Sequence, residues 1–244
     1  MGTMRFVTVF IAGLAAILAI AQPASGGPCS AMTPLVGPAF GAAIAPSETN
    51  VAFVIPGKSS WTAAALKGCV NLKSLITPGN SKLLGFDTVD DASLAEIGLP
   101  FDIFTIGLHQ LKEYYPGNPV APLVKQLDSR LYPLRVRGVV SSALVVSFRR
   151  STNELATTLW GLQELARLVT QYKKAESDFI VWVPAQNFHF LGNRPGDYPD
   201  ETLMLTPLIT RTSYGLIVGQ PVPAAVVFAL LAQQARLHDE YNPG

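Results

Sequence analysis

The chain has 244 residues, of which 49% are hydrophobic and 14% are charged, and this composition excludes an intrinsically disordered protein. The formal net charge of +1 argues against nucleic acid as a partner, because the domains that bind it carry a strongly basic surface. The length suits a single domain of ordinary size.

Residues 1–26 have the three-part layout of a secretory signal peptide. Arg5 precedes an apolar run from Phe6 to Ala21, and small residues follow that run. The run is shorter than the roughly 20 residues that a membrane-spanning helix needs, so a retained anchor is the weaker alternative. We therefore expect a secreted protein, extracellular or, in a bacterium, periplasmic, with no stable membrane span after the signal is removed.

The two cysteines of the chain, Cys29 and Cys69, are expected to form a disulfide. In an oxidising compartment an isolated pair is more often bridged than free. The bridge would tie an extended N-terminal arm, residues 27–50, to one mixed α/β domain over residues 51–244. Two cysteines and three scattered histidines make no cluster of metal ligands, so neither a metal nor another cofactor is expected.

The first half of the domain is expected to hold one buried strand and several helices. Apolar runs, capping residues and prolines give their limits. In chain order these are a strand at Val51–Ile55, a helix from Ser59 or Ser60 through Cys69, a short helix after Asp90 or Asp91, and helices over Asp102–Tyr115 and Pro122–Leu131.

The middle of the domain has the most regular pattern. Gly138–Phe148 is rich in β-branched residues, which is typical of a buried strand. Ser151 and Glu154 have the spacing of a capping box, which predicts a long helix from Ser151 to about Lys174. Asp178–Val183 predicts a second buried strand. Strand, helix and strand in this order indicate a βαβ unit with parallel strands.

The expected long helix has one apolar stripe. Apolar residues recur along it at steps of four and three, so they share one face. Leu159 and Leu162 belong to this stripe, and we expect both in the core.

The last part of the chain is expected to begin with a polar loop over Ala185–Glu201. Two strands follow, Thr202–Thr206 and Leu208–Val218, and Pro223 lies in the first turn of a final helix that reaches His238. The expected fold class is therefore α/β or α+β, with a single mixed sheet that contains a βαβ unit, helices packed on it and one disulfide.

Candidate ligand-binding residues follow the carboxyl ends of three expected strands. If those strands are parallel in one sheet, their ends share the edge where open α/β sheets bind ligands. The cations among these residues would suit a carboxylate, sulfate or phosphate group beside helix N-termini. The candidate residues are Lys58, Ser59, Arg149, Arg150 and His189.

Two functions from different classes fit the sequence. The balanced charge and the lack of known catalytic motifs favour a non-catalytic binding or interaction domain, whose partner is a small anionic molecule or an extracellular protein. The alternative is a secreted hydrolase whose site is built from loops around His189 and Asp197. A carboxylate within hydrogen-bond reach of His189 in a cleft would favour the enzyme.

Overall fold

A computed structural model describes residues 58–193 and 203–241. These residues form one nine-stranded sheet with the order β5-β4-β3-β2-β6-β7-β8-β9, and β1 pairs with β3 beside this path. The sheet is antiparallel at every pairing except that of β2 with β6, which is parallel. The expected mixed α/β class with a single sheet is confirmed, and the sheet is mostly antiparallel.

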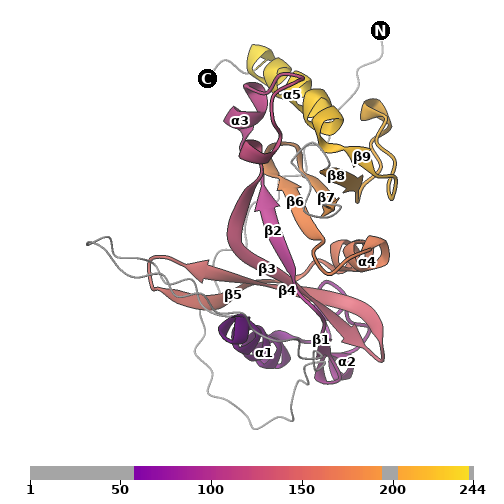
Figure 1. The fold of residues 1–244 in the computed structure, drawn as a ribbon. Coiled ribbons are helices and arrows are strands. Elements are labelled where there is room, and N and C mark those ends of the chain that lie inside the picture. Colours follow the sequence, from indigo (N-terminus) through magenta and orange to yellow (C-terminus); the bar gives the residue numbers. More distant parts are fainter. Residues whose placement is uncertain (1–57, 194–202, 242–244) are drawn as a thin grey trace, which may run out of the picture.

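The chain adds strands outward from the middle of the sheet (Figure 1). From β2 it builds β3, β4 and β5 toward one edge, and later β6 to β9 toward the other. In chain order they are β1 (Glu96–Ile97), β2 (Phe101–Thr105), β3 (Lys125–Val136), β4 (Val139–Arg149), β5 (Glu154–Gly161), β6 (Phe179–Val183), β7 (Phe188–Asn193), β8 (Met204–Pro207) and β9 (Val222–Pro223).

Helices cover both faces of the sheet. They are α1 (Lys58–Leu75), α2 (Val89–Ser93), α3 (Leu108–Lys112), α4 (Gln163–Tyr172) and α5 (Ala224–Tyr241). Within the described residues, no helix combines the length and the hydropathy that crossing a bilayer requires.

The long strand β3 joins two parts of the sheet that lie at a steep angle to each other (Figure 1). It pairs with β4 on one side and with β2 and β1 on the other. Register shifts interrupt its pairing with β2 near Asp102 and with β4 near Leu134, and such bulges increase the local twist of a sheet.

Three hydrophobic clusters fill the space between the sheet and the helices. Tyr132 and Leu144 pack under α1 and α2, and Phe190 and Leu205 pack under α3 and α5. The third cluster lies under α4, on the face that holds Leu131. Because alternate residues of a strand point to opposite faces, β3 and β6 each contribute to clusters on both faces.

The two strands with the clearest sequence pattern are confirmed. β4 matches the expected strand Gly138–Phe148, and β6 matches Asp178–Val183. The helices expected near Trp61, near Asp90 and after Pro223 are present as α1, α2 and α5. The Thr88 hydroxyl accepts a hydrogen bond from the Asp91 amide and so forms the N-cap of α2.

The long helix expected from Ser151 to Lys174 is wrong. This segment forms a hairpin strand, β5, and only then the shorter helix α4. Gly161 and Leu162 both have positive φ angles, 98° and 58°, and this backbone turn separates the strand from the helix. Leu159 on β5 is 45% exposed and Leu162 in the turn is 38% exposed, so the predicted place of both in the core is also wrong.

The expected βαβ unit is wrong for a related reason. β4 and β6 are not neighbours, because β3 and β2 lie between them. Helix α4 connects β5 to β6, and the parallel partner of β6 is β2. The strand that precedes α4 is therefore β5, which was expected to be part of the long helix, and the parallel pair in the described sheet is β2 with β6.

Other differences concern segments that pair with these strands. Asp102–Tyr115 begins with β2 and holds only the short helix α3, and most of Pro122–Leu131 belongs to β3. Residues 188–193 of the expected polar loop form β7, and Leu208–Val218 forms turns rather than a strand. Cross-strand pairing outweighs the weak local helix pattern in the first two cases.

Residues 1–57, which include the signal peptide, the arm, Cys29 and Val51–Ile55, lie outside the described residues.

Candidate ligand-binding pocket

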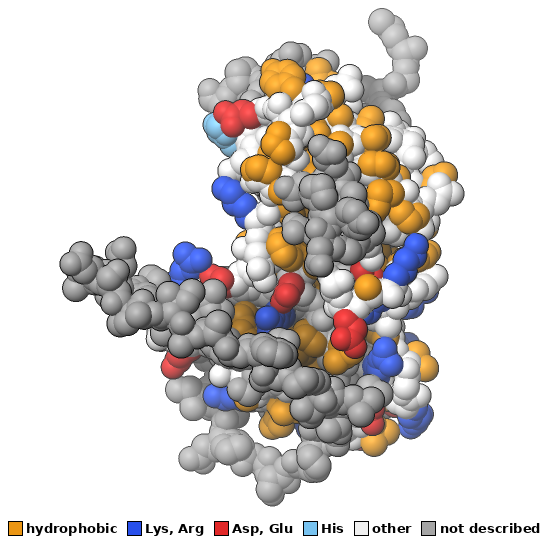
Figure 2. Space-filling model, viewed as in Figure 1, with side chains coloured by type: hydrophobic (Ala, Val, Ile, Leu, Met, Phe, Trp, Pro, Cys, Tyr) orange, Lys and Arg blue, Asp and Glu red, His pale blue; other side chains and the backbone are white. Residues whose placement is uncertain are grey.

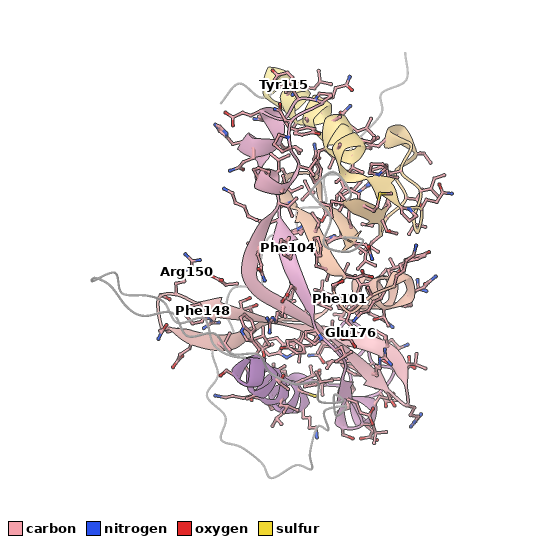
Figure 3. The ribbon with its side chains drawn as sticks, in the orientation of Figure 1. Phe101, Phe104, Tyr115, Phe148, Arg150 and Glu176 are labelled. Atoms are coloured by element: carbon pink, nitrogen blue, oxygen red, sulfur yellow. The ribbon has the colours of Figure 1, made fainter. Side chains whose placement is uncertain are left out.

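A pocket of about 450 Å³ opens between the end of α4 and strands β1 to β3. Phe101 of β2 and Glu176 of the turn after α4 both line it, and Figure 3 shows the two side by side. Its volume lies within the range of roughly 300–1,000 Å³ that is typical of small-molecule sites.

One side of the pocket is apolar. Phe101 is buried, Pro133 comes from the middle of β3, and Leu99 is 49% exposed in the connection between β1 and β2. The Gly98 amide donates a hydrogen bond of 2.8 Å to the Pro133 carbonyl, which fixes this connection on β3. A Cβ at Gly98 would lie 3.8 Å from Arg135 Nε, so the absence of a side chain there leaves room beside the guanidinium.

The opposite side is the turn that leads from α4 to β6. The buried Asp178 carboxylate holds this turn, because its Oδ2 accepts hydrogen bonds from the amides of Lys174 (2.6 Å) and Ala175 (3.0 Å). Its Oδ1 accepts a hydrogen bond from Asn193 Nδ2 of β7 at 2.5 Å. A carboxylate that anchors two successive amides makes this wall of the pocket well defined.

Three cations line the pocket: Arg135, Lys173 and Lys174. The Lys173 ammonium lies 4.8 Å from the centroid of the Phe101 ring. Glu176 is the only carboxylate in the described lining, and no carboxylate of the described residues forms an ion pair with any of the three cations. Glu96 lies opposite Arg135 in the strand register but forms no ion pair with it. The described lining thus carries a formal charge of +2.

Two buried polar atoms of the pocket residues have no hydrogen-bond partner among the described residues: Arg135 Nε and Thr170 Oγ1. A buried polar group without a partner costs about 1–3 kcal/mol, and most such groups in folded proteins are satisfied. An acceptor that reaches either atom would remove its cost.

The excess of positive charge is confined to the lining of the pocket, because the whole chain has a formal net charge of only +1. Figure 2 shows acidic and basic side chains mixed across the middle of the molecule. Long-range steering of an anion is therefore weak, and recognition depends on the groups at the pocket itself.

Among the predicted site residues whose side chains the structure describes, the arginines and His189 lie apart. Arg149 ends β4 and His189 lies in β7, with three strands between them, which at the usual strand spacing is about 19 Å across the sheet. Arg150 donates hydrogen bonds of 2.8 and 3.1 Å to the Asp128 carboxylate, and Figure 3 shows it far from Phe101 and Glu176. The side chains of Lys58 and Ser59 lie outside the described part.

His189 stands beside Trp182 of the neighbouring strand β6, with parallel rings whose centroids are 6.1 Å apart. Burial lowers the pKa of His189 below its ordinary value, because the interior disfavours the charged imidazole. No described residue forms a hydrogen bond with this imidazole. Asp197, its expected partner in the hydrolase alternative, is not among the described residues.

None of the polar residues that line the pocket was among the site residues predicted from the sequence. Lys173 and Lys174 were visible as a basic pair at the end of a helix, where the helix dipole favours positive charge. No sequence pattern marked Arg135 as a site residue. It lies in β3, and the first part of this strand was expected to be a helix. In the part of the chain that the structure describes, no group of His, Cys, Asp and Glu side chains could hold a metal ion.

Comparison of the chain with protein-family models, curated protein sequences and solved structures found no match.

Proposed function

We propose that this chain is a non-catalytic binding protein whose ligand is a small anion held in the pocket at the end of α4. The observation that supports the proposal is the convergence of Arg135, Lys173 and Lys174 on one pocket without an ion pair to any described carboxylate. A carboxylate or phosphate oxygen is the natural acceptor for the unpartnered Arg135 Nε, since charge-assisted hydrogen bonds are the strong ones.

The proposal is for binding rather than catalysis because of the residues at the pocket. Its described lining contains no histidine or cysteine, and its one carboxylate, Glu176, stands without a partner that could act with it as acid or base. The hydrolase alternative depends on His189 and Asp197, and no observation on the described residues favours it.

Secretion and the disulfide are part of the same proposal. The signal-like residues 1–26 support export, and an isolated cysteine pair in an exported chain supports a bridge from Cys29 to Cys69. Cys69 is buried in α1, so the bridge would fasten the N-terminal arm to this helix. Mass measurement after alkylation without reductant tests it: no alkylation is expected, and two alkylated thiols would rule the bridge out.

Calorimetric titration with inorganic phosphate, sulfate and benzoate tests the anion site. We expect at least one of them to bind the wild-type protein, and Arg135→Ala to weaken that binding about tenfold or more, since a charged hydrogen-bond donor is lost. The matched control is Arg149→Ala, which removes an exposed arginine from the far end of β4 and is expected to leave the affinity unchanged. Equal binding by both variants would exclude Arg135 from the site.

A further inference from the structure

The apolar side of the pocket distinguishes it from a site for a simple inorganic anion. Leu99 exposes about half of its side chain at the pocket, next to the buried ring of Phe101 and to Pro133. An exposed leucine that lines a pocket beside cations gains nothing from a phosphate or sulfate ion, which would leave it in water. A ligand with an apolar part would cover it.

The two sides of the pocket meet at Lys173. Its ammonium lies 4.8 Å from the centroid of the Phe101 ring, so one cation stands directly over the apolar surface. When the anionic group of a ligand contacts Lys173, the neighbouring atoms of that ligand lie close to the apolar side of the pocket. The charged end and the apolar body of such a ligand are therefore adjacent in the pocket, as they are in a small amphiphile.

The anion-binding atoms suit a carboxylate. The planar guanidinium of Arg135 matches the planar fork of a carboxylate. Glu176 in the lining opposes a ligand of high negative charge, which favours a monoanion over a doubly charged phosphate ester.

We infer that the pocket binds a monocarboxylate with an apolar body, such as a medium-chain fatty acid, an inference that rests on the anion binding proposed above. The carboxylate contacts Arg135 and Lys173, and the hydrocarbon covers the exposed side chain of Leu99, next to the buried Phe101 and Pro133. This deepens the proposed function from a small anion to a class of amphiphilic ligand.

The test compares probes that differ in only one part. Octanoate has the charge and a long apolar body, butyrate has the charge and four fewer methylenes, and octanol has the body without the charge. Each buried methylene tightens binding by about fourfold. Octanoate is therefore expected to bind at least tenfold more tightly than butyrate, even if only half of the extra methylenes are buried, and octanol is expected to bind much more weakly.

Two variants separate the charge from the apolar contact. Leu99→Ala is expected to weaken octanoate several-fold and to leave butyrate unchanged, whereas Arg135→Ala weakens both. The control for the leucine is Leu83→Ala, an equally conservative truncation at a position that is 83% exposed and does not line the pocket. Circular dichroism and thermal unfolding of each variant show that the fold is kept.

The outcomes distinguish the inference from the function on which it rests. Equal affinity for octanoate, butyrate and inorganic phosphate, all lost in Arg135→Ala, would overturn the amphiphilic ligand and keep the anion site. Octanol binding as tightly as octanoate would overturn the carboxylate ligand, and the absence of binding by every anion would overturn both the inference and the anion site. Binding to vesicles that contain phosphatidylglycerol without binding of free octanoate would assign the site to a membrane surface and overturn the inference.

Discussion

The ammonium of Lys173 lies 4.8 Å from the centroid of the Phe101 ring, and this contact joins the end of α4 to β2. The two residues come from segments far apart in the chain, which meet because β2 and β6 are parallel neighbours and α4 packs across the sheet. Their meeting creates a pocket with one cationic and one apolar side.

Asp178→Ala is expected to destabilise the protein by about 3 kcal/mol, because it leaves the amides of Lys174 and Ala175 and the Asn193 side chain without their buried acceptor. Urea unfolding measures the change. Asp128→Ala is the control, since this half-buried carboxylate accepts only from an exposed arginine, and it should cost less than about 1 kcal/mol. Similar costs for the two variants would show that Asp178 does not hold the turn.

Leu131→Ala and Leu159→Ala test the correction to the predicted long helix. Leu131 is fully buried under α4, so its truncation should cost about 2–5 kcal/mol. Leu159 is 45% exposed on β5, so its truncation should cost less than about 1 kcal/mol by chemical denaturation. The opposite ranking would restore Leu159 to the core and contradict the β5 hairpin.

How much of this fold could be predicted depends on where the decisive contacts lie. β4 and β6 were predictable because long β-branched, apolar runs leave few alternatives. The β5 and α4 segment was not, because its apolar residues mimic one helical stripe, and the only local warnings were Gly161 and the adjacent threonines of β5. The pocket could not be predicted, because the basic pair Lys173 and Lys174 joins Arg135 in one lining only through sheet pairing and helix packing.

Gly219→Ala is expected to destabilise the protein by about 1–3 kcal/mol more than Gly117→Ala does. Both glycines have positive φ angles, 79° and 96°, so both substitutions cause backbone strain. Only at Gly219 does the new Cβ meet a neighbour, 2.5 Å from Tyr172 Cε1 of α4, whereas nothing lies within 4 Å at Gly117. Thermal unfolding of the two variants isolates this contact, and equal losses would show that Tyr172 moves aside freely.

His189 is expected to make the stability of the protein depend on pH. Because burial lowers its pKa in the folded state below the unfolded value of about 6.5, the unfolded state binds more protons just below that pH. The contribution of the neutral imidazole to stability is fully present above about pH 6.5 and is lost as the pH falls through the folded-state pKa.

His189→Gln removes this titration and keeps a polar side chain beside Trp182. The free energy of unfolding of the wild-type protein should therefore fall more between pH 7 and pH 5 than that of the variant, as measured by urea unfolding at each pH. Parallel curves for the two proteins would mean that His189 titrates alike in the folded and unfolded states.

Backbone amide chemical-shift mapping during titration with octanoate shows whether the ligand occupies the pocket at the end of α4. We predict that the amides of Gly98, Arg135, Thr170 and Ala175 shift together and saturate at one ligand per chain. Saturable shifts confined to the hairpin after Arg149 or to the strand of His189, with these four amides unmoved, would contradict the account.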